Sequence, residues 1–192
     1  MRIFLIRHGE STSDMEERYG GHYNDHLTSK GANQAKKVAK KLAGKGIEII
    51  FSSPFHRAIE TSQILQKEWN CRFKIIGDLK ERDRYAHLTG MKKSVAAKNH
   101  AHHVARLKTY LHNVDGGEDY GPFKERIESA FEKISNSQHK TIAIVCHGGP
   151  IGCIMRELIG RETKYIGKCA VFELEKNGKL KLIKMENAGL EK

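Results

Sequence analysis

The sequence has little of what would mark a disulfide scaffold, a membrane protein or a disordered chain. Its 4 cysteines show no C-x-x-C spacing, which argues against a zinc knuckle and favours reduced, buried thiols. Only 3 prolines and 39% hydrophobic residues describe a folded composition. No apolar run approaches the roughly 18–20 residues of a membrane span. The run Met1–Ile6 is too short for a signal-peptide core, so we expect a cytoplasmic protein with no membrane partner.

Positive charge is in excess over negative charge. The chain has 34 Lys and Arg against 23 Asp and Glu, a net charge of +11. Such an excess suggests an anionic ligand, which includes phosphate, nucleic acid and acidic surfaces. The charge alone does not distinguish these ligands. The 192 residues fit one domain, so we expect a single domain over residues 1–192.

The hydrophobic pattern alternates strands with helices. We expect strands over 2–6, 47–51, 73–76 and 141–146, and a final hairpin of 170–174 and 180–185 around an Asn177-Gly178 turn. We expect helices over 30–42, from Pro54 to about 68, over about 93–112, from Pro122 onward and over 151–159. This order predicts an α/β fold, a three-layer α/β/α sandwich around a mostly parallel central sheet.

Polar side chains follow the ends of several expected strands. Arg7 and His8 follow the first strand, and His147 follows the strand over 141–146. Arg57 lies early in the helix after the second strand, and Glu81 follows the third. In sheets of this kind, ligands bind outside the carboxyl ends of the strands. We therefore expect these five side chains to converge.

Such a set suits a tetrahedral dianion. Arginine binds phosphate oxygens bidentately and keeps its charge. A neutral imidazole is a nucleophile able to form a phosphohistidine, and a carboxyl group can protonate a leaving oxygen and then activate water. This chemistry requires no metal and no other cofactor.

Five segments together resemble the motifs of one family. Arg7-His8-Gly9-Glu10-Ser11 resembles the RHGE(S/T) signature of the histidine phosphatase superfamily, which includes cofactor-dependent phosphoglycerate mutases. Four further segments, in family order, are similar to its other motifs: 27–35 (LTSKGANQA), 52–61 (SSPFHRAIET), 79–82 (LKER) and 145–149 (VCHGG). Gly117-Glu118 with Arg126 resembles a further element. The resemblance covers nearly the whole chain.

The resemblance implies a role for each matching residue. His8 would be the phosphorylated nucleophile, and Glu81 the proton donor and acceptor, with Glu10, Asp83 and Glu118 as rival carboxylates. Arg7, Arg57 and His147 would hold the phosphoryl group, and the Gly148 N–H would add a contact. The family pattern also implies a small helical lid insert over about 83–118.

The sequence departs from the family pattern at several positions. Asp14 stands where many members have Asn, as a candidate substrate contact or only a turn cap; a carboxylate there weakens phosphate binding unless it is protonated or paired. Gly20 replaces the usual Thr of mutases, Asp119 replaces a Ser, and Tyr85–Gly90 replaces an aromatic motif of phosphatases.

The stretch expected to form the lid is rich in histidine and in basic residues. His100-Ala101-His102-His103 is a candidate for binding a transition metal, but our preferred interpretation of these residues, with His87 and His112, is a solvated, pH-sensitive face with no metal. The basic residues of this stretch either grip the remote part of a ligand or form a solvated helix face: Lys92, Lys93, Lys98, Arg106 and Lys108.

The sequence thus favours a metal-independent phosphomonoester phosphatase that acts through phosphohistidine on His8. The alternative is a phosphoglycerate mutase primed by 2,3-bisphosphoglycerate, although dedicated mutases of the family are usually longer. A distant alternative is a non-catalytic basic protein that binds nucleic acid or serves as a scaffold, supported only by net charge. We expect a small phosphate ester as partner, no nucleic acid, and a monomer or homodimer.

Overall fold

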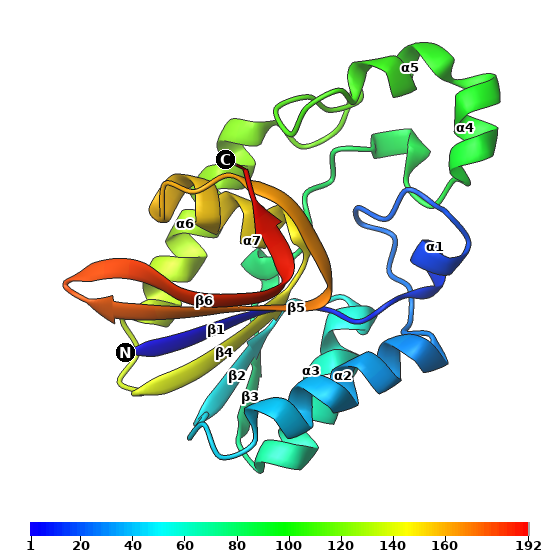
Figure 1. Ribbon diagram of the computed structural model, residues 1–192. Coiled ribbons are helices and arrows are strands. Elements are labelled where there is room, and N and C mark those ends of the chain that lie inside the picture. The colour runs from blue at the N-terminus through cyan, green and yellow to red at the C-terminus, as the bar shows by residue number, and fades with distance from the viewer. Residues whose placement is uncertain (192) are drawn as a thin grey trace.

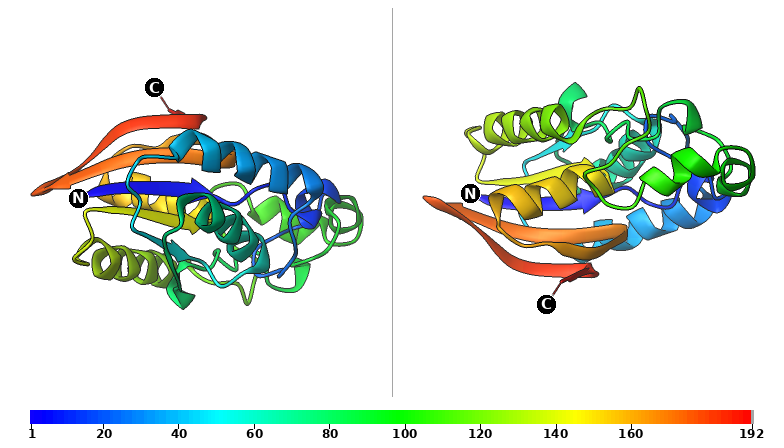
Figure 2. Two further views of the ribbon diagram at one scale, coloured as in Figure 1. Left: turned by 90° about the horizontal axis from the view of Figure 1, so that it is seen from below. Right: turned by 90° about the horizontal axis from the view of Figure 1, so that it is seen from above.

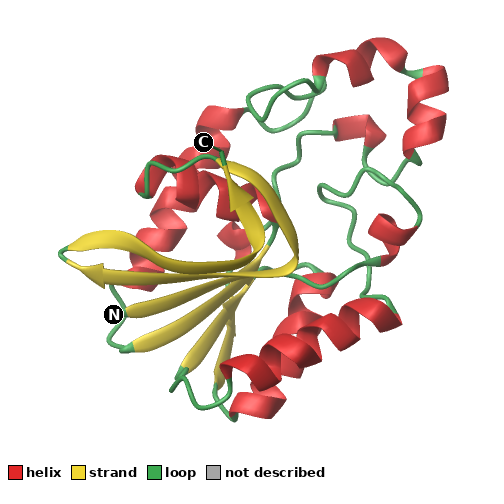
Figure 3. Ribbon diagram, in the orientation of Figure 1, coloured by secondary structure: helices red, strands yellow, loops and turns green. Residues whose placement is uncertain are grey.

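A six-stranded sheet forms the centre of the molecule. The computed structural model describes residues 1–191, and its strand order is β3-β2-β4-β1-β5-β6 (Figures 1 and 3). The strands are β1 Arg2–Arg7, β2 Ile49–Ser52, β3 Arg72–Ile75, β4 Thr141–Cys146, β5 Thr163–Asn177 and β6 Lys179–Leu190. Strands β1 to β4 run parallel to one another. Strand β5 runs antiparallel to β1, and β6 runs antiparallel to β5. The prediction of a mostly parallel sheet is confirmed.

Helices cover both faces of this sheet (Figure 2). In chain order they are α1 Thr12–Met15, α2 Ser29–Leu42, α3 His56–Trp69, the 3₁₀ turns η1 Gly77–Leu79 and η2 Ala86–Leu88, α4 Lys93–Asn99, α5 Ala101–Arg106, α6 Tyr120–Ser135, α7 Gly148–Cys153 and the π-helical η3 Ile154–Leu158. Helices α2 and α3 pack on one face, and α6, α7 and η3 on the other. The three-layer prediction is confirmed.

The apolar run of β1 explains its central place. Ile3 and Leu5 pack into the core under α6, while Phe4 and Ile6 pack into the core under α2 and α3. All four side chains are fully buried, since successive strand residues point to opposite faces and both faces are covered. A strand buried on both faces has a continuous hydrophobic run rather than an alternating one.

The helix starts that were predicted at Pro54 and Pro122 were each wrong by two residues. Helix α3 begins at His56 rather than Pro54, because Ser53 continues the extended backbone and donates to Val145 O at 2.9 Å. Helix α6 begins at Tyr120, before Pro122. Pro122 therefore occupies the first turn, where the N–H groups have no partner within the helix and the missing donor costs nothing. The Thr28 cap of α2 is confirmed, since its Oγ1 accepts the Gly31 N–H at 3.0 Å.

The final hairpin is longer than expected. Its turn lies at Asn177-Gly178 as predicted, with Gly178 at φ +69°. Both strands extend well beyond the apolar segments 170–174 and 180–185 from which they were predicted. Register shifts in β5 let this strand bend and keep pairing with β6. One of these irregularities spans residues 166–171, close to His8.

Residues 83–118 lie beyond the carboxyl ends of the parallel strands (Figure 1). The expected helix over 93–112 is broken at His100 into α4 and α5, and residues 107–112 are not helical. A small separate core of Leu88, Ala96 and Val114 holds this segment together. Its function as a lid stays a prediction. Within residues 1–191, no helix combines the length and apolar character needed to cross a membrane.

Two backbones touch where the loop after β1 meets α2. A Cβ atom on Gly31 would lie 2.0 Å from Glu10 O, and one on Gly9 would lie 2.5 Å from Gly31 O. Real side chains never approach so closely, and both neighbours are backbone. The loop that carries His8 is therefore held against α2 by two glycines.

We expect Gly31→Ala to destabilise the fold by about 2–4 kcal/mol, because the methyl group must displace the main chain of Glu10. Gly121→Ala is the matched control: Gly121 is exposed in α6 with open space around its Cβ position, so it should be neutral or stabilising by up to about 1 kcal/mol. Urea unfolding of both variants measures the difference. Equal stabilities would mean that the close contact does not constrain the loop.

Candidate active site

The register of β1 with β4 brings the two predicted histidines together. Arg7 pairs with Cys146, and His8 N donates to Cys146 O at 3.0 Å. His8 and His147 are therefore the first residues beyond paired strand ends, and their ring centroids lie 5.1 Å apart. Arg57 reaches the same place from the first turn of α3, with its Nε 3.3 Å from His8 Nε2.

Burial and hydrogen bonding define the protonation state of His8. Its Nδ1 lies 2.7 Å from Gly9 O, which can only accept, so Nδ1 carries the proton and Nε2 holds a lone pair. Burial, followed by the neighbouring His147, Arg57 and Arg7, holds the pKa of His8 well below its ordinary value. His8 is therefore a neutral imidazole near pH 7, with the lone pair of Nε2 facing Arg57.

A buried acid positions Arg57. The Arg57 guanidinium is 3% exposed and donates to Asp25 Oδ1 at 2.9 Å, Tyr23 O at 2.6 Å and Gly21 O at 3.0 Å. Burial raises the pKa of Asp25, but hydrogen bonds from Ser11 and Ser13 and the charge of Arg57 outweigh it, so the net pKa is lowered. Asp25 stays ionised and fixes Arg57. The sequence analysis missed Asp25, which follows no strand.

Two buried nitrogen atoms near His8 have no hydrogen-bond partner within residues 1–191. The fully buried His147 uses Nε2 to contact Ser53 Oγ at 2.6 Å, while its Nδ1 has no hydrogen-bond partner, and Arg7 Nε is likewise buried without one. A Cβ on Gly148 would lie 3.7 Å from the Arg7 guanidinium carbon, so this glycine lies beside Arg7. Unpaired buried polar atoms cost free energy. Bound anion oxygens would satisfy them.

Glu81 reaches the cavity from the segment after η1. Its carboxylate accepts the Arg82 N–H at 2.9 Å and the Gly149 N–H at 3.2 Å. A Cβ at position 149 would lie 2.1 Å from Glu81 Oε1, so the glycine leaves room for the carboxylate in this orientation. Three rival carboxylates are paired elsewhere and do not line the cavity within residues 1–191: Glu10 with Lys30, Asp83 with Thr89 and His22, and Glu118 with Arg126.

The carboxylate that departs from the family pattern has a cationic partner. Asp14 forms an ion pair with Lys168 of β5 and accepts hydrogen bonds from the N–H and Oγ of Ser11, both at 3.0 Å. Burial raises the pKa of Asp14, but Lys168 and Ser11 lower it by more, so it stays ionised. Asp14 is thus both a turn cap and a paired charge.

Lys168 is a cavity residue that the sequence analysis missed. It lies in the irregular part of β5, next to Cys169 at φ +55°, whose N–H donates to His8 O at 3.2 Å. Burial and the charge of Arg7 lower the pKa of Lys168 to about 8, and Asp14 offsets part of this shift. No motif marks this lysine, because only the bend in β5 brings it to His8.

The cavity above these residues has a volume of 490 Å³. Its inner wall holds Arg7, His8, Arg57, Glu81, Gly148 and Lys168, and His147 lies buried behind it. Its outer wall holds Arg84, Tyr85, Lys93, Tyr110, Tyr120 and Arg156. The cavity therefore offers cations at its base and a mixed aromatic and basic wall above them, which suits an anionic ligand larger than phosphate.

The lowered pKa of Lys168 predicts a pH-dependent anion affinity. Sulfate stays a dianion from pH 6 to 10, so only protein groups titrate. Lys168 is charged below about pH 8 and neutral above it. Sulfate affinity should therefore fall by roughly tenfold or more as the pH rises through 8, because the bound anion loses one charge-assisted hydrogen bond. Isothermal titration calorimetry at several pH values measures this fall.

The variant Lys168→Arg should keep its sulfate affinity up to pH 10, because a guanidinium does not deprotonate there. Lys164→Arg, an exposed lysine of the same strand, is the control and should behave like the parent. A parent affinity that is flat across pH 8, or a Lys168→Arg variant that still loses affinity, would contradict this placement of the charge.

Comparisons with known proteins agree with the geometry. Residues 3–191 match the family model of the histidine phosphatase superfamily (branch 1). The chain is 26% identical over 162 residues to adenosylcobalamin/alpha-ribazole phosphatase of Escherichia coli, covering 83% of this chain and 80% of that protein. It is 30% identical over 156 residues to phosphoglycerate mutase-like protein 4 of Arabidopsis thaliana, covering 78% and 67%.

Solved structures share the fold at lower identity. YhfR of Bacillus stearothermophilus aligns with a TM-score of 0.87 at 21% identity, over 97% of this chain and 96% of that one. The alpha-ribazole phosphatase of Shigella flexneri aligns with a TM-score of 0.84 at 23% identity, over 95% of each chain. The motifs around His8 and His147, the three-layer fold and the family match lead to one assignment: the chain belongs to the histidine phosphatase superfamily.

Proposed function

We propose that this protein is a phosphomonoester phosphatase that acts through a phosphohistidine on His8 and needs no metal. The observation that carries the proposal is the neutral, buried His8, whose Nε2 lone pair faces Arg57 while Nδ1–H is held by Gly9 O. The cations Arg7, Arg57 and Lys168 around it repel a divalent metal and attract a phosphate dianion.

The first step transfers the phosphoryl group to the protein. His8 Nε2 forms a bond to phosphorus as the bond from phosphorus to the ester oxygen breaks, and the Glu81 carboxylic acid gives its proton to the leaving alkoxide. In the second step Glu81, now a carboxylate, takes a proton from water. The hydroxyl attacks phosphorus, the phosphorus–nitrogen bond breaks, and neutral His8 and phosphate are restored.

The remaining groups of the inner wall, together with His147 behind it, hold the transferring oxygens. Arg7 Nε is an unpartnered donor, and His147 Nδ1 is a second one when its Nε2 accepts the Ser53 hydroxyl proton; Arg57 and the Gly148 N–H complete the set. Such fixed donors stabilise the charge on the equatorial oxygens of the transition state. Asp14 acts at this site through Lys168, whose charge it helps to retain.

The outer wall points to a substrate with a second polar or anionic group. Within the described residues, Arg84 and Lys93 have no carboxylate partner, and Arg84 Nε is buried without a hydrogen bond. Arg156 stacks on Tyr110, with the guanidinium carbon 3.4 Å from the ring centroid. We propose that Arg84, Lys93 and Arg156 contact the part of the substrate that lies away from the phosphate that reacts with His8.

A phosphoglycerate mutase is the second candidate, because one of the relatives is named as mutase-like. Gly20, in place of the usual Thr of mutases, favours hydrolysis. A panel of phosphomonoesters with and without 2,3-bisphosphoglycerate separates the two: phosphate release identifies a phosphatase, and primed interconversion without release identifies a mutase. The nucleic-acid or scaffold alternative, the cytoplasmic location and the monomer or homodimer stay predictions.

We expect His8→Ala to lower turnover by about 10⁴-fold or more, because no other residue can carry the phosphoryl group. Rapid quench with a ³²P-labelled ester should trap acid-labile, base-stable label on the parent and none on the variant. His102→Ala, a change at an exposed histidine that does not line the cavity, should label like the parent. Full turnover of His8→Ala, or label on another residue, would refute the assignment.

We expect Glu81→Gln to slow alkyl phosphates by about 10²–10⁴-fold and nitrophenyl phosphate much less, because a good leaving group needs no acid. Glu10→Gln, a carboxylate outside the cavity, should keep the parent's dependence on the leaving group. Measured kcat values over a series of leaving groups test this. An equal loss for all esters in Glu81→Gln would assign the acid role to another group.

A further inference from the structure

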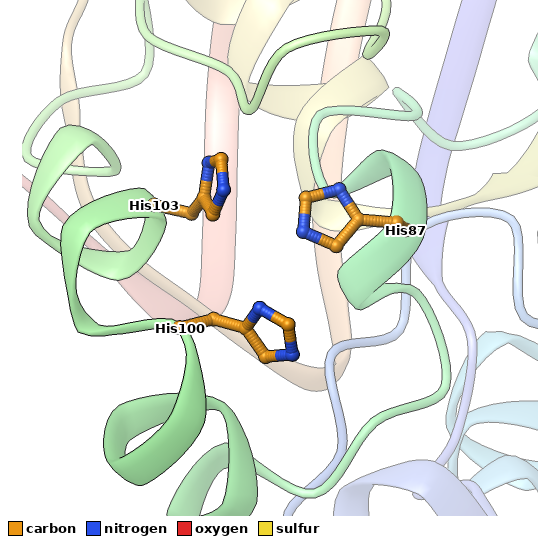
Figure 4. Close-up of side chains that lie close together, drawn as sticks. All are labelled: His87, His100 and His103. Atoms are coloured by element: carbon orange, nitrogen blue, oxygen red, sulfur yellow. The ribbon is translucent and has the colours of Figure 1, made fainter.

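Three histidines outside the candidate active site converge on one point. His87 lies in η2, His100 between α4 and α5, and His103 in α5. One ring nitrogen of each lies within 4.8 Å of the others, and Figure 4 shows the three rings turned toward a common centre. The sequence pattern suggested His100, His102 and His103 as a group. The structure replaces His102 with His87, which lies 13 residues from His100.

These rings have no ordinary hydrogen-bonding role. Within residues 1–191, no hydrogen bond or ion pair involves the imidazole rings of His87, His100 and His103, and His103 Nδ1 is buried without a partner. The ring centroids lie 4.7 Å apart for His87 and His103 and 5.4 Å apart for His87 and His100. Three unpaired imidazoles this close leave their lone pairs unused, which a common ligand would correct.

The surroundings select the kind of ligand. Neutral imidazole is a strong ligand for zinc, copper and nickel, and no carboxylate joins the group, which disfavours magnesium and calcium. Tetrahedral zinc with bonds of about 2.0–2.1 Å holds its donors about 3.4 Å apart. Rotation of the partly exposed rings closes the remaining distance.

The backbone under the cluster is already held in place. Leu88, next to His87, and Ala96, in α4, pack with Val114 in the small core of this segment. Leu88 N donates to Tyr85 O at 2.9 Å, and His100 N to Ala96 O at 2.7 Å. The two chain segments that present the rings are therefore ordered before any ligand binds, which lowers the entropy cost of binding.

We propose that His87, His100 and His103 form a structural site for a transition metal of the zinc class, with water as the fourth ligand, that links η2 to the α4–α5 junction. The site is separate from the phosphoryl chemistry. It lies beside the outer cavity wall, because Tyr85 precedes η2 and Lys93 begins α4. The bound metal would hold that wall together.

Zinc titration of the untagged, metal-stripped full chain tests the proposal by calorimetry in a buffer that does not chelate. The parent should bind one equivalent, and His87→Ala, His100→Ala and His103→Ala should each weaken this binding by about tenfold or more. Two controls should bind like the parent: His102→Ala, an exposed histidine of the same helix, and His8→Ala, which removes the cavity histidine.

A second measurement uses the parent protein alone, so it does not depend on whether the variants fold. In ¹⁵N-edited spectra of histidine side chains of the parent, zinc should shift the ring resonances of His87, His100 and His103 and leave those of His102 and His112 in place. Zinc should also raise the Tm of the parent, because it binds the folded state. Binding that survives His103→Ala, or shifts confined to the stacked surface pair His26 and His56, would overturn the proposal.

Discussion

The hydrogen bond from His8 Nδ1–H to Gly9 O is the interaction on which the candidate site depends. It assigns the proton to one ring nitrogen and the lone pair to the other, and burial among cations keeps the ring neutral. Without this bond the ring could turn or change tautomer, and Nε2 would not face Arg57 consistently. The close contact of Gly9 with Gly31 holds the loop that carries both groups of this hydrogen bond against α2.

Ion pairs within the protein, rather than solvent, hold the cationic side chains of the site in place. Arg57 is buried against Asp25, and Lys168 is partly buried against Asp14, so each cation has one carboxylate of its own. Each pair keeps its cation in place without neutralising Arg7, whose Nε stays unpartnered. The base of the cavity therefore keeps a positive field for a dianion, although two carboxylates lie close to it.

The sequence allowed much of this site to be predicted, because strand ends share one edge of a parallel sheet. His8, His147, Arg57 and Glu81 each follow a strand closely, so local pattern and topology suffice to bring them together. Lys168 was unpredictable, since its position depends on a bulge and a positive φ at Cys169. The proline positions misled at α3 and α6, because extended pairing and the first helical turn both tolerate proline.

The two walls of the cavity differ in what holds them. The inner wall is built on strands whose side chains join the two large cores, whereas the part of the outer wall formed by residues 83–118 rests on the small core of Leu88, Ala96 and Val114. So small a core supplies little stability, and small units of this kind need additional links. Arg82 supplies one, donating from Nε to Glu118 O at 2.8 Å and from its guanidinium to Tyr110 O. A metal on the three histidines would supply another. The part of the outer wall formed by residues 83–118 and the base of the cavity around His8 are therefore stabilised by separate parts of the chain, so a substitution in the small core should affect this part of the wall more than the position of His8.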